Sequence, residues 1–165
     1  MCKIIPNQSG MDFIAENTFH IEQSRLFKNI GDGVRTVELI RAKDDKLLFI
    51  EAKTSFPNPI NPKTENTTRF QEEIIEVCEK FIHSLNMFSS VKSGVSEHGF
   101  HSDFIVPKKI KLVFMLIIKN HEFEWCKPIK VEIEEILPLY LKKIWKPIVY
   151  VINQEIASEQ ELIIN

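Results

Sequence analysis

The sequence predicts an α/β domain in which a three-strand antiparallel meander leads a mixed central sheet and helices flank that sheet. Three observations predict this fold class. Residues 34–42 and 46–54 are largely apolar runs of strand length on either side of a short polar turn. Residues 66–88 carry apolar side chains at the roughly 3.6-residue spacing of an amphipathic helix. Downstream, apolar runs at 110–118 and 147–152 alternate with helical segments, as in a mixed α/β sheet.

The composition is typical of one soluble globular domain. The 165 residues are 44% hydrophobic and 27% charged, so we expect a single domain spanning residues 1–165. The formal net charge of −2 argues against strong nonspecific nucleic-acid binding over the whole surface, although a local basic surface stays open. The longest apolar run, residues 112–118, is too short to cross a bilayer, so we expect no membrane association.

The cysteines and the start of the chain indicate a cellular compartment. Cys2, Cys78 and Cys126 are odd in number and widely spaced, and they contain no Cys-x-x-Cys pair. This pattern argues against a disulfide framework or a structural zinc site and fits a reducing environment. Residues 1–6 lack the apolar stretch of a signal peptide, so we expect a cytoplasmic protein.

The first strand of the meander is expected near the beginning of the chain. Residues 19–22 alternate apolar and polar side chains, which predicts a strand from Phe19 to about Phe27. A turn follows at residues 31–33, where Gly, Asp and Gly stand together. The third strand must end before the prolines of residues 56–62, because each proline removes a hydrogen-bond donor from the ladder.

The second and third strands form a hairpin whose turn sets its register. Asp residues tolerate the left-handed conformation of a two-residue turn, here Asp44-Asp45. The two residue numbers of each cross-strand pair then add up to the same total as those of Lys43 and Lys46, so Glu38 lies opposite Glu51. Side chains alternate along a strand, so Lys53 shares the face of Glu51. We expect both at a strand end, outside the packed core.

Facing carboxylates at this hairpin predict a metal site. Two carboxylates about 5 Å apart on neighbouring strands destabilise a sheet unless a cation lies between them. Glu38 and Glu51 are therefore candidate metal ligands, with Lys53 beside them. The alternative is a solvated strand end that carries an ordinary Glu–Lys pair.

The long helix begins near Asn66, where neighbouring Thr side chains can cap it. We interpret the acidic stripe on its polar side as a solvated face (Glu72, Glu73, Glu76 and Glu79). Its apolar side includes Cys78, which we expect to act as a small core residue.

The remaining elements complete the sheet. Residues 110–118 form a continuous apolar run, as expected of a strand buried on both faces. A helix is expected at 132–145, which Pro138 must kink or delay. A strand at 147–152 and a short helix at 154–162 end the chain.

A loop at residues 97–103 gathers two histidines and two acids (Glu97, His98, His101 and Asp103). The His-x-x-His spacing does not place both rings on one helix face, as His-Glu-x-x-His would. A polar loop is the preferred interpretation, and a metal role is the alternative.

Together, these residues and the element order resemble the PD-(D/E)XK phosphodiesterase superfamily, which has the restriction-endonuclease-like fold. Its signature is an acid on the second strand of a meander and a Glu-x-Lys or Asp-x-Lys on the third. Glu38 and residues 51–53, Glu-Ala-Lys, match it here. The chain departs from the pattern in having Glu38 in place of the usual Asp and Val37 in place of Pro. It also has Ile75 where some members have the Tyr of a Gln-x-x-x-Tyr motif.

The resemblance implies a metal-dependent nuclease that acts on nucleic acid, such as DNA. Glu38 and Glu51 would hold Mg²⁺ (or Mn²⁺), which activates a water as the nucleophile. Lys53 would stabilise charge on the attacked phosphate or position that water, so all three are candidate catalytic residues. Glu22 is a candidate outer acid, and an exposed strand residue is the alternative.

Many members of this superfamily have lost activity, so the fold alone does not establish the chemistry. The alternative function is a catalytically inactive module for protein interaction or assembly. Such a module would act in a homo-oligomer or with a partner subunit.

Overall fold

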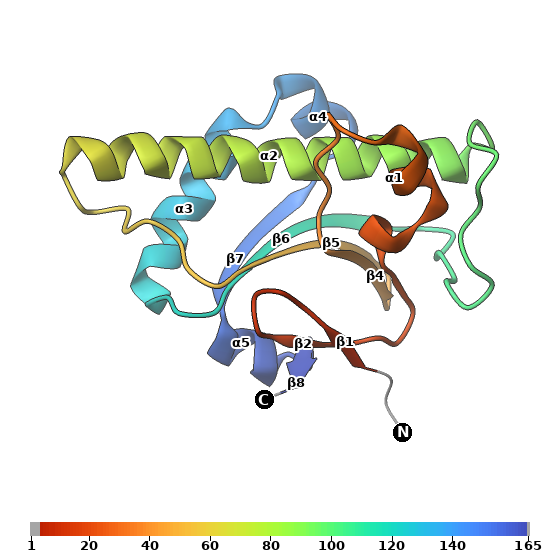
Figure 1. The fold of residues 1–165 in the computed structure, drawn as a ribbon, viewed down its shortest axis with the longest axis horizontal. Helices are drawn as coiled ribbons and strands as arrows, with labels where there is room; N and C mark the ends of the chain where they lie inside the picture. Colours follow the sequence, from red (N-terminus) through yellow and green to blue (C-terminus); the bar gives the residue numbers. More distant parts are fainter. Residues whose placement is uncertain (1–3, 165) are drawn as a thin grey trace.

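The computed structural model describes residues 4–164 and confirms the mixed α/β fold class (Figure 1). Its main sheet has five strands in the order β3-β4-β5-β6-β7. The first three are antiparallel neighbours, whereas β5, β6 and β7 run parallel. The strands are β3 (Thr18–Phe19), β4 (Leu39–Lys43), β5 (Lys46–Lys53), β6 (Lys111–Ile118) and β7 (Ile148–Asn153).

The predicted hairpin register is confirmed by the pairing of β4 with β5. The pairs run from Lys43 with Lys46 at the turn to Leu39 with Ile50. The strand expected from residue 34 begins only at Leu39, however, so Glu38 lies one residue before it and the predicted Glu38–Glu51 pair is not part of the ladder. The reason lies in the long helix above the sheet. The amide of Val37 donates to Ser84 Oγ at 2.8 Å, which takes this backbone away from the ladder.

The strand predicted from Phe19 to Phe27 was wrong beyond its first residue. β3 ends at Phe19 and is followed by a 3₁₀ turn, η1 (Ile21–Gln23), and a short helix, α1 (Arg25–Ile30). Ser24 caps this helix, because its Oγ accepts a hydrogen bond from the amide of Phe27 at 3.1 Å. The Ser24 cap therefore favours a helix at residues where the alternating pattern predicted a strand.

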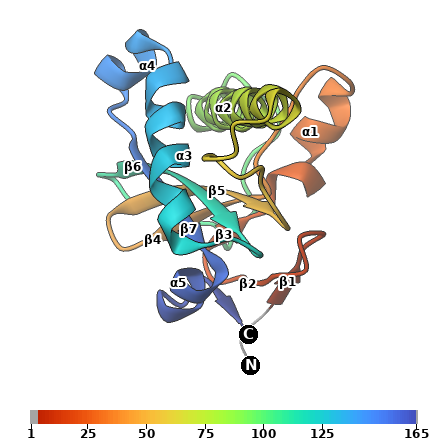
Figure 2. The same ribbon diagram turned by 90° about the vertical axis from the view of Figure 1, so that its left-hand side faces the viewer.

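The helix α2 (Thr64–Lys92) lies along one face of the sheet, and α3 (Phe123–Ile136) packs beside it (Figures 1 and 2). The rings of Phe81 and Phe114 stack with their centroids 4.6 Å apart, which joins α2 to β6. The helix expected at 132–145 is two helices, since α3 begins earlier and Pro138 precedes α4 (Leu139–Ile144). Pro138 thus separates two helices, whereas a kink in one helix or a later start was predicted.

The other face of the main sheet is covered by a second sheet that the sequence did not predict. Its antiparallel order is β1-β2-β8, formed by β1 (Ile4–Pro6), β2 (Asp12–Ile14) and β8 (Ile163–Ile164). The helix α5 (Gln154–Glu159) lies beside it (Figure 2). Phe13 of β2 is fully buried against this face. Both faces of the β4–β5 hairpin are therefore covered, as its two-sided apolar pattern predicted.

Two smaller expectations concern the thiols and the membrane. Cys78 and Cys126 are free and buried, and burial raises the pKa of Cys78 to about 12, as expected of a core residue. Cys2 lies outside the described residues. Within residues 4–164, no helix combines the length and the apolar character needed to cross a membrane.

Candidate metal centre and its charge network

The strand β5 presents Glu51 and Lys53 to the face of the sheet that lies under α2. Their neighbours on this face, Leu47 and Phe49, belong to the core that α2 covers. Glu51 lies near the end of β5, as expected from the sequence, but it is fully buried and not outside the packed core. The expectation was wrong because α2 crosses above this end of β5 (Figure 1). A buried carboxylate requires partners.

Glu51 has one strong partner and one open oxygen. Lys80 of α2 places its Nζ 2.6 Å from Glu51 Oε1. Among the residues that the structure describes, Glu51 Oε2 has no hydrogen-bond partner. Burial raises the pKa of Glu51 to about 7, because desolvation outweighs the opposing effect of the Lys80 ammonium. The negative charge of Glu38 raises this pKa further, which places the two carboxylates in the same electrostatic neighbourhood.

Lys53 is held by acids of α2. Its Nζ donates to Glu73 and, at 3.1 Å, to Glu76. Burial alone would lower the pKa of Lys53, but the two carboxylates raise it above its ordinary value, so the ammonium stays charged. Arg35 also reaches the acidic side of α2, with its Nη1 3.2 Å from Glu79 Oε2. The acidic stripe is therefore not only a solvated face, because Glu73 and Glu76 bind a lysine of the sheet.

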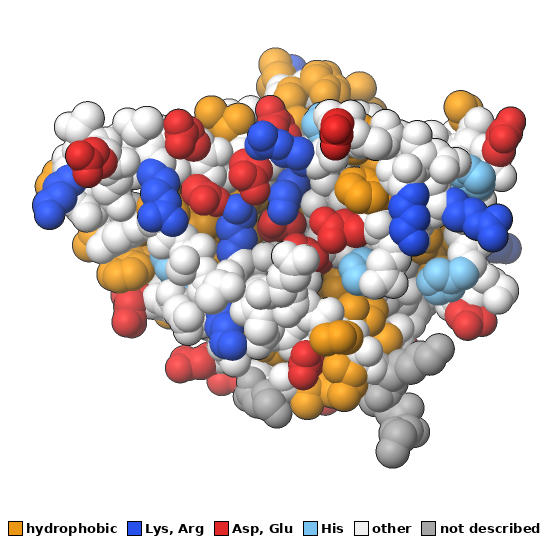
Figure 3. Space-filling view, viewed as in Figure 1, with side chains coloured by type: hydrophobic (Ala, Val, Ile, Leu, Met, Phe, Trp, Pro, Cys, Tyr) orange, Lys and Arg blue, Asp and Glu red, His pale blue; other side chains and the backbone are white. Residues whose placement is uncertain are grey.

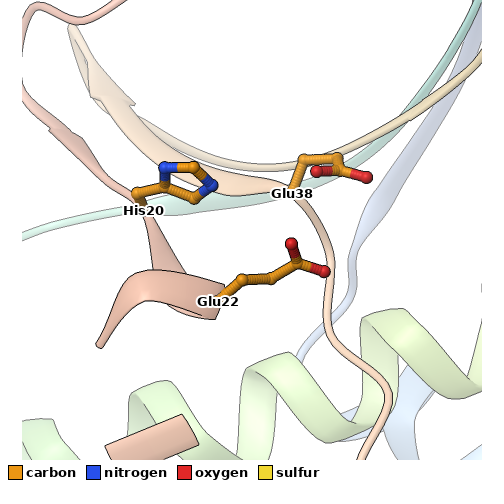
Figure 4. Close-up of side chains that lie close together, drawn as sticks. All are labelled: His20, Glu22 and Glu38. Carbon is orange, nitrogen blue, oxygen red and sulfur yellow. The ribbon is translucent and has the colours of Figure 1, made fainter. Parts of the chain in front are cut away.

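A second cluster lies beside this network and joins three segments of the chain (Figure 4). His20 follows β3, Glu22 is in η1, and Glu38 precedes β4. One ligand atom from each side chain can be chosen so that all three lie within 4.8 Å of one another. Asn7 Nδ2 donates to Glu38 Oε2 at 2.7 Å, which orients that carboxylate. Glu22 is thus neither on a strand nor exposed; it is half-buried.

The local electrostatics suit a cation. Burial and the charge of Glu38 raise the pKa of Glu22, with Lys80 opposing them. Burial lowers the pKa of His20, although Glu38 opposes this effect. Acidic and basic side chains mix across the middle of this face in the space-filling view (Figure 3). The donor set of two carboxylates and one imidazole fits a divalent metal ion, and the charge of Glu38 also acts on the buried Glu51.

The loop at residues 97–103 packs against the start of the main sheet. The loop packs through Phe100 and Phe104 against Phe19, and His101 contacts the carbonyl of Thr18. The polar-loop interpretation is thus incomplete, because aromatic side chains anchor this loop.

Lys80 is a site residue that the sequence did not predict. No pattern along the sequence pointed to Lys80, which reaches Glu51 only because α2 folds over β5.

Comparison with known proteins gives one relationship. The chain is 32% identical over 82 residues to the UPF0102 protein CPE1705 of Clostridium perfringens. It matches a UPF0102 protein from a second strain of that organism at the same identity over the same length. In both cases the match covers 48% of this chain and 67% of the relative. No family model and no solved structure matches the chain.

Proposed function

This chain belongs to the UPF0102 family, and we propose that it is a metal-dependent phosphodiesterase of the PD-(D/E)XK type that hydrolyses nucleic acid. The observation that carries the proposal is the open, buried oxygen of Glu51 in the neighbourhood of Glu38. Such an oxygen is costly unless a cation or a donor completes its environment. The meander-led mixed sheet supports the same assignment.

Each residue has a chemical role in this proposal. Glu38 and Glu51 would hold Mg²⁺ or Mn²⁺, which when bound supplies a nucleophilic water of lowered pKa and neutralises charge on the phosphate. Lys80 fixes the orientation of the Glu51 carboxylate through its contact at 2.6 Å. Lys53 carries a permanent positive charge on the same face of β5 and would stabilise the negative charge that develops on the attacked phosphate.

The proposal is tested with labelled single- and double-stranded DNA and RNA oligonucleotides. We expect cleavage with Mg²⁺ or Mn²⁺ and none after chelation with EDTA. Glu38→Gln should bind the ion more weakly by at least about tenfold, because it removes a charged ligand, whereas Glu38→Asp should keep part of the activity. The readouts are the cleavage rate and the metal affinity from calorimetry.

The matched control for this experiment is Glu159→Gln on α5, which lies on the other side of the main sheet. This variant should cleave and bind metal like the wild type. Cleavage that survives chelation, or a Glu38→Gln variant as active as the wild type, would contradict the proposal. Thermal unfolding of each variant shows whether the fold is intact.

A second candidate function, assembly, is favoured by an apolar surface around α4. We call this the α4 surface, and it consists of exposed side chains: Ile136, Leu139, Tyr140, Ile144 and Trp145. The exposed fraction reaches 62% for Leu139 and 72% for Ile144. The surface forms the orange group at the top of Figure 3, where α4 lies in Figure 1. Clustered apolar side chains are typical of protein interfaces, and a second copy of the chain could cover this one.

If the α4 surface is a homodimer interface, Ile144→Glu should convert a dimer to a monomer. The reason is that the new carboxylate would be desolvated at the centre of the contact. Sedimentation velocity at several micromolar protein concentrations measures the change. The control is Val95→Glu, which alters an apolar side chain that is 79% exposed on a distant loop. A wild type that is monomeric at every concentration would contradict this second function.

A further inference from the structure

The cluster of His20, Glu22 and Glu38 contains a nitrogen ligand that the Glu-x-Lys signature does not include. The three side chains come from separate segments and converge on a common point (Figure 4). Within residues 4–164, no hydrogen bond or ion pair joins any two of them. Their convergence is therefore not explained by contacts that they make with one another.

A second observation, at the electrostatically coupled Glu51, points to a ligand. Glu51 is fully buried, and its Oε2 has no partner among the described residues. Lys80, which holds the other oxygen of Glu51, also acts electrostatically on Glu22, and Glu38 acts on both Glu22 and Glu51. Lys80 and Lys53 both act electrostatically on Glu51, but Lys53 is also paired with Glu73 and Glu76. The carboxylates of this region therefore outnumber the ammonium groups, and a divalent cation would balance the excess negative charge.

The contacts of the cluster leave ligand atoms for coordination. The imidazole of His20 offers a ring nitrogen, the kind of donor that transition-metal ions bind. Glu38 is anchored by Asn7 at one oxygen, which leaves its other oxygen for a further contact.

We propose that His20 is a ligand of the bound ion together with Glu22 and Glu38, and that this mixed nitrogen–oxygen site prefers a first-row transition-metal ion to Mg²⁺. Mg²⁺ is a hard cation that is bound through oxygen and retains several waters. Imidazole instead suits transition metals, whose affinities rise from Mn²⁺ to Co²⁺ and beyond. The inference deepens the proposed function by naming the class of ion. It rests on that function only because Glu38 is a metal ligand in both.

Binding is measured by calorimetry with Co²⁺ and with Mg²⁺. The protein should carry no histidine tag and should have the substitution Cys2→Ser, so that an added imidazole or an additional thiol does not bind the probe. We expect Co²⁺ to bind at least about tenfold more tightly than Mg²⁺. His20→Ala should weaken Co²⁺ binding by about tenfold or more and change Mg²⁺ binding much less, so the preference should shrink.

A spectroscopic measurement reports the nitrogen ligand directly. With Mn²⁺ as the probe, pulsed EPR should show a nitrogen hyperfine coupling in the wild type. The coupling should be absent in His20→Ala and unchanged in His101→Ala, which removes a nearby exposed imidazole as the matched control. If His20→Ala does not fold, the wild-type spectrum alone decides, because a wild type without this coupling overturns the proposal.

The outcomes separate this inference from the proposed function. Tight metal binding that depends on Glu38 but not on His20 would overturn the inference and leave a metal-dependent phosphodiesterase possible. Equal affinity for Co²⁺ and Mg²⁺ would overturn it in the same way. A nitrogen coupling and a transition-metal preference without cleavage of any nucleic acid would support the site and contradict the proposed activity.

Discussion

Replacing Lys80 by Met should destabilise the folded protein by on the order of 3 kcal/mol at pH 8, and by much less at pH 5. Lys80 is the ammonium that contacts the fully buried Glu51 at 2.6 Å. Methionine keeps most of the side-chain volume but leaves the buried carboxylate without a counter-charge. Urea unfolding curves at the two pH values measure the free energy of unfolding.

The pH dependence follows from the direction of the pKa shift. Glu51 has a pKa of about 7 in the folded protein, above its ordinary value of 4.5. A carboxyl group whose pKa is raised by folding contributes its full stability below pH 4.5 and loses that contribution as the pH rises through 7. Lys80 lowers this pKa, so its removal moves the folded pKa higher still. The decrease in the free energy of unfolding caused by Lys80→Met therefore grows between pH 5 and pH 8.

Two control variants test whether the lost stability comes from the unpaired, buried charge of Glu51. The double variant Lys80→Met/Glu51→Gln should recover most of the lost stability at pH 8, because neither charge remains. Lys111→Met breaks an ion pair with Asp45 of the same 2.6 Å length, but both side chains are more than half exposed. That variant should unfold like the wild type. An equal effect of Lys80→Met at pH 5 and pH 8 would show that Glu51 is not the origin of the change.

The hairpin and its register were predictable because they depend on local information. The turn at Asp44-Asp45 and the alternation along residues 46–53 are properties of a few neighbouring side chains. The long helix was predictable for the same reason, since its apolar spacing persists over many turns. The second sheet was not, because β2 pairs with β8 from the opposite end of the chain.

The composition of the site was only partly predictable. Alternation along β5 predicted that Glu51 and Lys53 share a face, but their partners come from α2, and the cluster that contains Glu38 is completed by His20 and Glu22. Lys80 meets Glu51 only once α2 crosses the sheet, and nothing in its local sequence distinguishes it from a surface lysine. His20 and Glu22 were interpreted as parts of a strand. The 3₁₀ turn instead brings them to Glu38, a convergence that depends on tertiary structure.

Replacing Lys53 by Ala should lower the rate of phosphodiester cleavage about 10²- to 10³-fold, because the change removes a positioned cation that stabilises charge in the transition state. The free energy of unfolding should change much less, by ~1 kcal/mol, because the partners Glu73 and Glu76 are partly exposed to water. Lys53→Arg should recover part of the rate, since it keeps the charge but changes the donor geometry. Single-turnover cleavage at saturating Mn²⁺ measures the chemical step.

Measuring the metal affinity distinguishes a role of Lys53 in cleavage from a role in metal binding. The ammonium of Lys53 donates hydrogen bonds to Glu73 and Glu76 of α2, and Lys53 is not in the cluster formed by His20, Glu22 and Glu38. Lys53→Ala should therefore bind Mn²⁺ as the wild type does, whereas Glu38→Gln should not. Lys46→Ala, at the exposed start of the same strand, should leave both properties unchanged. If Lys53→Ala keeps the wild-type cleavage rate, Lys53 belongs only to the ion network under α2. If no variant or wild-type protein cleaves nucleic acid, the assembly function of the α4 surface is favoured.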